Sequence, residues 1–435
     1  MEFNRISVIG LGYIGLPTAA VIASRGKQVV GVDSNQHVVD TINRGDIHIV
    51  EPELDSMVHS AVVDGYLRAT AEPEQADVFL IAVPTPFKAE GGDDHVPDLS
   101  YIEAASKSIA PAIQKGNLVI LESTSPVGAT EKMAQWLADA RPDLSFPQDA
   151  GEGSDIRIAH CPERVLPGNI LQELVSNDRV VGGITKRCST LAAEFYKIFV
   201  RGECIVTNAR TAEMCKLTEN SFRDVNIAFA NEMSIICDEL GVDVWELIKL
   251  ANRHPRVNIL QPGPGVGGHC IAVDPWFIAS QAPASSRLIK TARSVNDEKP
   301  NWVVRKVKEL VTEVVKATGK HERDIRVACL GLAFKANIDD LRESPAMEVA
   351  IELSKCFKNQ VLAVEPYLEE LPESLSSNGA KLVGLSEAME SDVIVLLVDH
   401  KEIVDYPIEV GSNQRALDTR GVLKKDKVFD FTAKG

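Results

Sequence analysis

The strongest constraint on the fold lies in residues 6–33, where closely spaced glycines separate two short hydrophobic runs. The first run is β-branched and ends directly at Gly10, Gly12 and Gly15, and an apolar helical stretch follows. The second run ends at Asp33. Gly10 permits a tight turn, Gly12 lets a ligand approach the backbone, and Gly15 allows a helix to pack closely on a strand. This order of strand, glycine turn, helix, strand and acid is typical of a dinucleotide-binding βαβ unit.

The same turn indicates which dinucleotide binds. The helix after the turn offers free N–H groups and the positive end of its dipole to phosphates. Asp33 is placed to accept hydrogen bonds from ribose hydroxyls and would repel the 2′-phosphate of NADP. The sequence therefore predicts NAD, with Tyr13 and Ile14 of the turn beside the cofactor.

Further hydrophobic runs continue the alternation of strands and helices. Residues 77–83 end at a Pro-Thr-Pro turn that contains Thr85, and residues 118–124 end at Thr124, with Thr130 opening the next helix. Ligands of doubly wound sheets lie beyond the carboxyl ends of the strands, so these threonines are expected to line the cofactor cleft. A helix cap or a turn is an equally good interpretation of each threonine taken alone.

Length and composition exclude several classes of function. A chain of 435 residues is expected to hold two or three domains. Its net charge of −16 argues against sequence-independent binding to nucleic acid or to anionic membranes. The eight cysteines include no CxxC pair, so neither a zinc site nor a disulfide framework is expected. With no signal peptide and no apolar run of roughly 18 residues, the chain is predicted to be cytoplasmic.

A long stretch without helix breakers, residues 211–240, is predicted to form a helix. Lys216, Asn220 and either Arg223 or Asp224 would share one face of it, because they lie three or four residues apart. A lysine and an asparagine at this spacing can stabilise a developing oxyanion. A solvated polar face is the alternative, but the largely apolar neighbours favour a buried pair.

The segment 262–275 holds four glycines and two prolines ahead of a single cysteine, Cys270. Glycine and proline disfavour helix and strand alike, so we expect a loop whose backbone closely approaches another group. We expect the Cys270 thiol to be a covalent nucleophile, with Asp274 four residues further on. The other seven cysteines lie in apolar, helical or turn segments and are expected to be inert core thiols.

Basic residues precede this loop. A predicted helix over residues 243–252 leads directly into Arg253, His254 and Arg256. These side chains form an anion-binding edge suited to a diphosphate. For His254 taken alone, a role in a turn is the better interpretation.

The C-terminal third begins a second alternation of helices and strands. A helix over residues 289–318, broken or bent near Pro300, is predicted to connect the halves of the chain. The first strand after it is not followed by GxGxxG, so a second NAD is not expected. Strands are expected at the hydrophobic runs 325–331, 360–364, 392–398 and 428–431.

The predicted fold class follows from both alternating regions, with further strand candidates at residues 156–160 and 179–183. Alternating strands and helices imply parallel sheets covered by helices on both faces. The chain is therefore predicted to be an α/β protein in which two Rossmann-like, doubly wound domains flank a central helical domain. The expected boundaries are 1–200, 201–318 and 319–435.

Several motifs occur in an order that is specific to one family. They are GLGYIGLP at 10–17, PTP at 84–86, ESTSPVG at 122–128, CPER at 161–164, AEMCKLTEN at 212–220, PGPGVGGHCIAVDP at 262–275, GLAFKANIDDLRESP at 331–345 and DTRG at 418–421. Over nearly its whole length the chain resembles the nucleotide-sugar 6-dehydrogenases, which act on UDP-glucose and UDP-N-acetylhexosamines. The resemblance implies an NAD-dependent, four-electron oxidation of a UDP-sugar.

In this family the oxidation passes through a thiohemiacetal and a thioester on the cysteine that matches Cys270. The resemblance implies that Lys216 and Asn220 stabilise the oxygens of these intermediates, and that Lys216 also transfers protons. Asp274 and Thr124 would orient the lysine and a water molecule.

The resemblance assigns further roles. Glu163 would be the general base for thioester hydrolysis, and Arg342 would reach the cofactor. The C-terminal domain would hold the UDP moiety. Arg256 would reach the substrate of a neighbouring subunit, which implies a homodimer built on the central helices. The remaining implied substrate contacts are Arg164, Val165, Lys216, Asn220, Arg223, His254, Gly267, Lys335 and Arg420.

The loop around Cys270 also indicates a branch of the family. UDP-glucose dehydrogenases carry a GFGGSC-type loop followed by a lysine before the aspartate, whereas this chain has His269 before the cysteine and Val273 before Asp274. That pattern looks like the branch that acts on N-acetylated hexosamines. It implies oxidation of UDP-N-acetyl-D-mannosamine to its uronic acid, a precursor of a surface polysaccharide such as enterobacterial common antigen.

Other functions remain open from the residues. UDP-N-acetylglucosamine and UDP-glucose are alternative substrates. A two-electron hydroxyacid-type dehydrogenase shares the architecture and the lysine–asparagine pair but has no need of Cys270. An epimerase that uses NAD catalytically would release no NADH. A non-catalytic nucleotide-binding module would need neither the pair nor the thiol.

Overall fold

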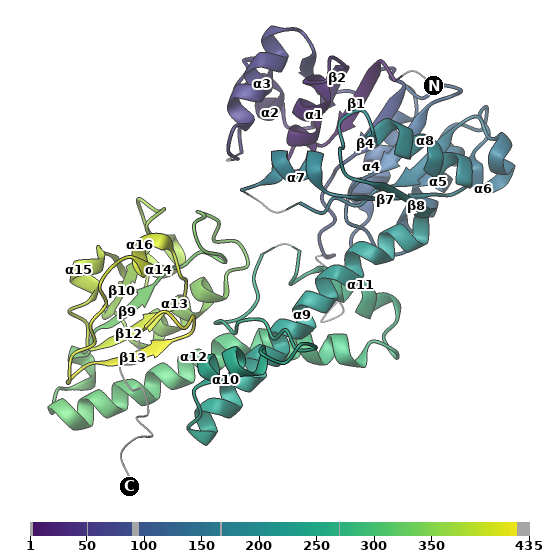
Figure 1. Cartoon of the computed structure of the whole chain (residues 1–435). Coiled ribbons are helices and arrows are strands. Elements are labelled where there is room, and N and C mark those ends of the chain that lie inside the picture. The colour runs from purple at the N-terminus through teal and green to yellow at the C-terminus, as the bar shows by residue number, and fades with distance from the viewer. Residues whose placement is uncertain (1–2, 50, 89–94, 166–167, 269, 424–435) are drawn as a thin grey trace. The chain divides into compact units, whose positions relative to one another are not determined.

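The computed structural model describes residues 3–49, 51–88, 95–165, 168–268 and 270–423. The chain divides into two compact units (Figure 1). The first unit comprises Met1–Glu219 with Ser280–Ala282, and the second comprises Asn220–Ala279 with Pro283–Gly435. The three-domain boundaries therefore stay a prediction. Among the described residues, no helix is long and apolar enough to cross a membrane.

The first unit is built on one eight-stranded sheet with the order β3-β2-β1-β4-β5-β6-β7-β8. Its first six strands are parallel, and the positive-φ turn of the glycine motif follows the central strand β1. The strands are β1 (Arg5–Ile9), β2 (Gln28–Val32), β3 (Leu67–Thr70), β4 (Val78–Ile81), β5 (Leu118–Leu121), β6 (Arg157–His160), β7 (Arg179–Gly183) and β8 (Cys204–Asn208).

Helices cover both faces of this sheet, as its strand composition requires. Along β5, Leu118 and Ile120 enter one buried cluster while Val119 and Leu121 enter the other. A strand that is apolar at every position is stable only when both of its faces are buried. The helices are α1 (Gly15–Ala23), α2 (Gln36–Asn43), α3 (Leu54–Val63), α4 (Ser100–Ile109), α5 (Ala129–Ala140), α6 (Pro147–Ala150), α7 (Ile170–Ser176) and α8 (Lys186–Tyr196), with the 3-10 turn Gly151–Gly153 after α6.

Two strands depart from the predicted parallel sheet. β7 pairs antiparallel with β6, through Ala159 with Gly183 and His160 with Gly182. β8 then pairs parallel with β7, so these last two strands run against the other six. A parallel return needs a crossover helix that spans the sheet. The seven-residue α7 is too short for that return, and β7 instead starts near the edge at which β6 ends.

In the second unit long helices precede a smaller sheet. The helices are α9 (Ala209–Leu240), which begins in the first unit, α10 (Val244–Ala251), α11 (Asp274–Gln281) and α12 (Arg287–Thr318). α12 runs through Pro300 without a break, so of the expected break or bend the break is wrong and the bend stays a prediction. Proline removes one N–H donor, and a helix of this length keeps its remaining hydrogen bonds.

The smaller sheet is fully parallel, with the order β11-β10-β9-β12-β13. The strand predicted at 428–431 lies outside the described residues, and β13 forms the edge. The elements are β9 (Val327–Leu330), α13 (Pro345–Cys356), β10 (Val361–Val364), α14 (Glu373–Ser376), β11 (Lys381–Leu382), α15 (Leu385–Ala388), β12 (Val393–Leu396), α16 (Lys401–Val404) and β13 (Arg415–Asp418), with the 3-10 turn Glu322–Asp324 before β9.

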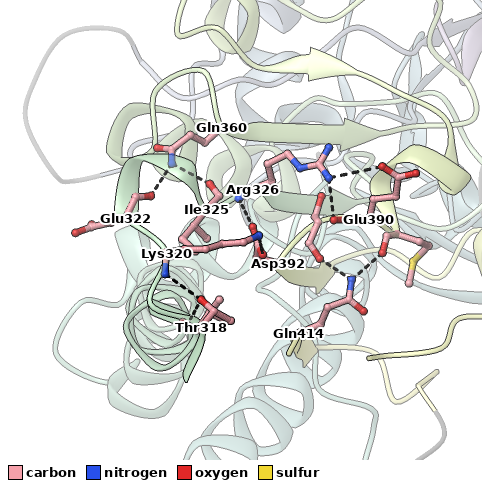
Figure 2. A network of polar contacts seen from close by, with 12 residues as sticks. Thr318, Lys320, Glu322, Ile325, Arg326, Gln360, Glu390, Asp392 and Gln414 are labelled. Atoms are coloured by element: carbon pink, nitrogen blue, oxygen red, sulfur yellow. Dashed lines mark hydrogen bonds and ion pairs between the residues drawn. The ribbon is translucent and has the colours of Figure 1, made fainter. Parts of the chain in front are cut away.

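A polar network joins the end of α12 to the start of β9 (Figure 2). The Lys320 ammonium lies 2.5 Å from the Asp392 carboxylate, which also accepts the Arg326 N–H at 3.0 Å. The Gln360 amide donates to the carbonyls of Glu322 at 2.7 Å and Ile325 at 2.8 Å. The network lies where the strands begin, so it leaves their carboxyl ends clear for ligands.

The prediction for the other seven cysteines is partly wrong. Cys161, Cys188, Cys237 and Cys329 are buried, as expected of core thiols. Cys356 is exposed, because it is the last residue of α13. Cys204 on the edge strand β8 and Cys215 on α9 are half-buried.

Candidate active site

The glycine turn of the first unit has the geometry that its sequence requires. Gly10 has φ +88°, and a Cβ there would lie 2.7 Å from the Ala82 carbonyl oxygen. A Cβ on Gly15 would lie 1.8 Å from the Gly10 carbonyl oxygen, so the helix could not pack on the turn. Gly12 is exposed and has no neighbour within 4 Å of such a Cβ, which leaves its backbone open to a ligand.

Asp33 lies at the end of β2 beside this turn. One carboxylate oxygen accepts the Leu11 N–H at 3.0 Å, and the other accepts the Asn35 N–H at 2.9 Å. The side chain is half-buried, so it keeps lone pairs for a ligand. Tyr13 is exposed and Ile14 is half-buried at the start of α1.

The three predicted threonines differ in what their hydroxyls contact. The Thr85 hydroxyl, after β4, is buried and lacks a hydrogen-bond partner among the described residues. Thr124 follows β5 and is half-buried. Thr130 is fully buried and donates its hydroxyl to Glu213 at 2.6 Å. Of the three, Thr85 therefore presents a buried hydroxyl that is unsatisfied among the described residues. The cofactor roles of all three stay predictions.

The Glu213 carboxylate was missed by sequence reasoning. It accepts the N–H groups of Gly128 at 2.6 Å and Thr130 at 2.8 Å, and so satisfies the N-terminus of α5. Burial raises the pKa of Glu213. Glu213 lies 83 residues from Thr130, so no local spacing could have revealed this contact.

Glu163, the predicted general base, is buried in an ion pair. Its carboxylate accepts from the Arg179 guanidinium at 2.6 Å and from the Arg164 N–H at 2.6 Å. Arg164 also binds Glu219 at 2.7 Å. Val165 packs against the core. A polar cavity of about 340 Å³ beside these groups is lined by Arg164, Asn177, Asp178 and Glu219.

A second buried carboxyl group, also missed, neighbours Glu163. Glu122 accepts the Tyr196 hydroxyl at 2.5 Å, and its other oxygen has no hydrogen-bond partner among the described residues. Burial, together with the charge of Glu163, raises the pKa of Glu122 to about 7. A charged residue that directly ends the apolar run of β5 was the one signal available in the sequence.

The pair predicted on the long helix lies on α9. Lys216 and Asn220 are half-buried and one turn apart. The Asn220 amide donates to the Asp274 carboxylate at 2.5 Å, which connects α9 to the start of α11. Of the two further candidates, Arg223 is exposed, whereas Asp224 is buried and binds Arg293 at 2.6 Å.

The glycine loop packs closely on the C-terminal part of the same unit. A Cβ on Gly267 would lie 2.3 Å from the Glu343 carbonyl oxygen and 2.7 Å from Pro345. A Cβ on Gly265 would lie 2.8 Å from Pro345 and 3.3 Å from Pro300. Only glycines permit this approach. His269 lies outside the described residues, and Cys270 beyond it is exposed.

Two predicted substrate cations lie at the carboxyl ends of the small sheet. Lys335 follows β9 and is exposed. Arg420 follows β13 and pairs with Asp399 at 2.8 Å. The Arg420 guanidinium also lies 3.0 Å from the position of a Cβ on Gly263. The structure therefore brings Arg420 to the glycine loop.

The remaining predicted cations are exposed. Arg342 pairs with Asp340 at 2.7 Å. The His254 ring accepts the Arg256 N–H at 3.4 Å, which is the turn role considered for this histidine. The Asn252 amide closes the turn by binding the backbone of Ile259 at 2.7 and 3.0 Å. The ligand roles of Arg342, His254 and Arg256 stay predictions.

The small sheet repeats the first turn of the large one. Gly331 has φ +87° and donates its N–H to Val364, just as Gly10 donates to Val32 at the same distance of 2.8 Å. Glu365 follows β10 and accepts the Leu332 N–H at 2.7 Å. Unlike Asp33, Glu365 is buried and lies 3.1 Å from the His400 ring.

The glycine turn, the acid beside it and the Thr85 hydroxyl, which lacks a partner among the described residues, fit NAD. Together with the fold they define a Rossmann-type NAD-binding protein. Three family models match in order. They are the NAD-binding, central and UDP-binding domains of the UDP-glucose/GDP-mannose dehydrogenase family, over residues 4–200, 210–298 and 328–425. The chain belongs to this family, and it is an NAD-dependent nucleotide-sugar dehydrogenase.

Individual relatives cover almost the whole chain. The UDP-N-acetyl-D-mannosamine dehydrogenase of Yersinia pestis is 63% identical over 97% of this chain and 100% of its own length. An NDP-N-acetyl-D-galactosaminuronic acid dehydrogenase of Ralstonia nicotianae is 60% identical over 98% of both chains. The solved UDP-D-ManNAc dehydrogenase of Pyrococcus horikoshii has a TM-score of 0.84 at 39% identity, and covers 98% of this chain and 97% of its own.

Proposed function

We propose that the chain oxidises UDP-N-acetyl-D-mannosamine at C6 to UDP-N-acetyl-D-mannosaminuronate. The observation that carries this proposal is the exposed Cys270 at the end of a loop built into the UDP-binding unit. The relatives at 62–63% identity that bear the mannosamine name support the choice of sugar. The product is a building block for a surface polysaccharide, as enterobacterial common antigen would require.

The reaction converts a CH2OH group and one water into a carboxylate, two hydrides and three protons. NAD, when bound, accepts a hydride in each of the two oxidations. Between them the Cys270 thiolate adds to the C6 aldehyde and forms a thiohemiacetal. Loss of the second hydride leaves a thioester, which water cleaves to give the acid and the thiol.

The chain's own residues stabilise and direct these steps. Lys216 and Asn220 donate hydrogen bonds to the oxygen on C6 as it gains charge. Asp274, held by the Asn220 amide, orients Lys216 and a water molecule together with Thr124. Glu163 supplies a carboxylate as the base for thioester hydrolysis, and must exchange its bond to Arg179 for one to water.

The test is the number of NADH molecules that the purified protein forms for each sugar oxidised. UDP-N-acetylmannosamine should yield two NADH per sugar, and UDP-N-acetylglucosamine, UDP-N-acetylgalactosamine and UDP-glucose should react more slowly. One NADH per sugar would point to the two-electron hydroxyacid-type reaction and reject the thioester route. A preference for the galacto sugar would instead favour the activity named for the Ralstonia relative.

We further propose that the enzyme is a cytoplasmic homodimer. Phe222, Phe229 and Ile236 recur every seven residues on α9 and are 70%, 50% and 38% exposed. Side chains at this spacing share a helix face, and an apolar face of this kind needs a partner. The exposed Arg256 is available to a neighbouring subunit. A reduced thiol suits the cytoplasm.

A further inference from the structure

Both ends of the thiol loop are tied to the same helix. The exit is held by Asn220, whose amide donates to Asp274 at 2.5 Å. The entry is held by Asn231, whose amide oxygen accepts the Gly263 N–H at 2.9 Å. Positions 220 and 231 are about three turns apart, so both asparagines face the same side of α9. Cys270 lies between these two attachments.

The orientation of the Asn231 amide is fixed by its partners. The Gly263 N–H can only donate, so the atom that receives it is the amide oxygen. The Asn231 amide nitrogen must then donate to the Asn296 oxygen on α12, at 2.9 Å. Asn231 is fully buried, so neither end of the amide can turn to water instead.

A chain of donors continues from Asn231 to a buried charge. The Asn296 amide donates to the Asp224 carboxylate at 2.8 Å, and Arg293 donates to the same oxygen at 2.6 Å. A carboxylate only accepts and a guanidinium only donates, so the direction of every bond is determined. Asp224, Arg293 and Asn296 are each at most 2% exposed. The α9–α12 pair therefore presents the Asn231 amide oxygen as an oriented acceptor to the loop.

We propose that Asn231 is a positioning residue for Cys270, which fixes the entry of the thiol loop as Asn220 fixes its exit. The inference rests on the proposed function in one respect, namely that the positioned thiol serves the proposed oxidation at C6. A thiol held at both ends of its loop captures the C6 aldehyde before the aldehyde leaves the site. A loop released at its entry lets aldehyde escape after one oxidation.

The test compares Asn231→Ala with Ser234→Ala in the full-length protein. Ser234 lies on the same helix, where its hydroxyl accepts from Lys299 and donates to the Asn231 carbonyl oxygen. Its loss therefore removes part-buried hydrogen bonds but leaves the Asn231 amide and the loop untouched. Asn231→Ala should lower the NADH yield from two per sugar toward one, with the missing oxidation recovered as hydroxylamine-trapped aldehyde. Its kcat should fall by roughly tenfold or more while KM changes less than about threefold. Ser234→Ala should keep two NADH.

A second readout does not depend on the sugar. The rate at which iodoacetamide alkylates Cys270, followed by mass spectrometry across pH, should change several-fold in Asn231→Ala and not in Ser234→Ala. If Asn231→Ala does not fold, Asn231→Ser and Asn296→Ala replace it in the test. Each weakens the hydrogen bond that Asn231 accepts from the Gly263 N–H, while a polar side chain stays at position 231.

The outcomes are separable. Unchanged NADH yield and unchanged Cys270 alkylation in a folded Asn231 or Asn296 variant would overturn the positioning role. One NADH per sugar in the unmodified protein would instead overturn the proposed function, and the alkylation comparison would still decide what Asn231 does.

Discussion

At the scale of single residues, the first unit buries two neighbouring carboxyl groups, those of Glu122 and Glu163. Glu163 forms an ion pair with Arg179, whereas among the described residues Glu122 is hydrogen-bonded to the Tyr196 hydroxyl alone. Burial and a neighbouring carboxylate both favour the protonated form of a carboxyl group and so raise its pKa. The protein is therefore expected to be sensitive to the ionisation of Glu122.

The pH dependence of the free energy of unfolding should reveal the ionisation of Glu122. The pKa of Glu122 is about 7 in the fold against an ordinary 4.5, so the folded state binds the extra proton between these values. Its stabilising contribution is complete below about pH 4.5 and is lost as pH rises through 7. Glu122→Gln keeps an acceptor for Tyr196 but cannot ionise. Its free energy of unfolding should gain on the order of 3 kcal/mol relative to the parent between pH 5 and pH 8.

Denaturant unfolding at the two pH values measures this gain. Glu131→Gln is the control, because Glu131 forms an exposed ion pair with Arg210. A difference between Glu122→Gln and the parent that stays constant with pH would show that Glu122 is already ionised near pH 5.

The Cys270 thiol gives the second prediction at this scale. Cys270→Ala should bind NAD normally but lose acid formation by roughly a thousandfold or more, since the covalent intermediate cannot form. NADH production and a fluorescence titration with NAD measure the two properties. Cys356→Ala removes the exposed thiol at the end of α13 and should keep full activity. Normal acid formation by Cys270→Ala would rule out the thioester.

At the scale of elements, sequence patterns located the strands that are buried on both faces and the long helices. The run 179–183 coincides with β7, and the helix predicted over 211–240 is α9 (Ala209–Leu240). Hydrophobic periodicity is strong in such elements because burial determines it. The edge strands β3, β8, β11 and β13 went unpredicted, since partly exposed positions in strands of two to five residues leave little pattern.

The candidate site likewise divides into features that the sequence predicts and contacts that it does not. The glycine turn, its acid and the glycine loop are local in sequence, and their geometry follows from steric rules that one stretch reveals. The contacts of Glu213, Asn231 and Glu163 depend on partners 16 to 85 residues away. A single sequence contains no signal for such pairings, so only the fold could show them.

The close packing of the glycine loop supplies a prediction for this element. Gly267→Ala would place a Cβ 2.3 Å from the Glu343 carbonyl oxygen, so the loop must move off the 331–345 segment. The expected result is a loss of roughly 1–3 kcal/mol in free energy of unfolding and a kcat at least tenfold lower. Denaturant unfolding and steady-state kinetics measure both effects. Gly384→Ala, where a Cβ meets nothing within 4 Å, should change neither.

At the scale of the whole molecule, the exposed apolar face of α9 predicts self-association. Phe229→Asp places a charge in the middle of that face, so light scattering should show the mass fall from a dimer to a monomer of about 47.3 kDa. Val63→Asp, on an exposed apolar residue of α3, should leave the mass unchanged. A parent protein that is itself monomeric and fully active would contradict the dimer.

The repeated glycine turn has a consequence for how nucleotide sites are recognised. A search for a strand followed by a glycine turn and an acid would assign this chain two dinucleotide-binding turns, one at Gly10 and one at Gly331. Asn337 donates its N–H to the second nitrogen of the His400 ring, so His400 must give its one proton to Glu365 and close that acid off. Among the described residues no side chain donates to Asp33, which accepts backbone N–H groups of Leu11 and Asn35. The acid of this second turn thus serves as an internal structural acceptor, and the partner of the acid, rather than the pattern of strand, glycine and acid, distinguishes an open dinucleotide turn from a closed one.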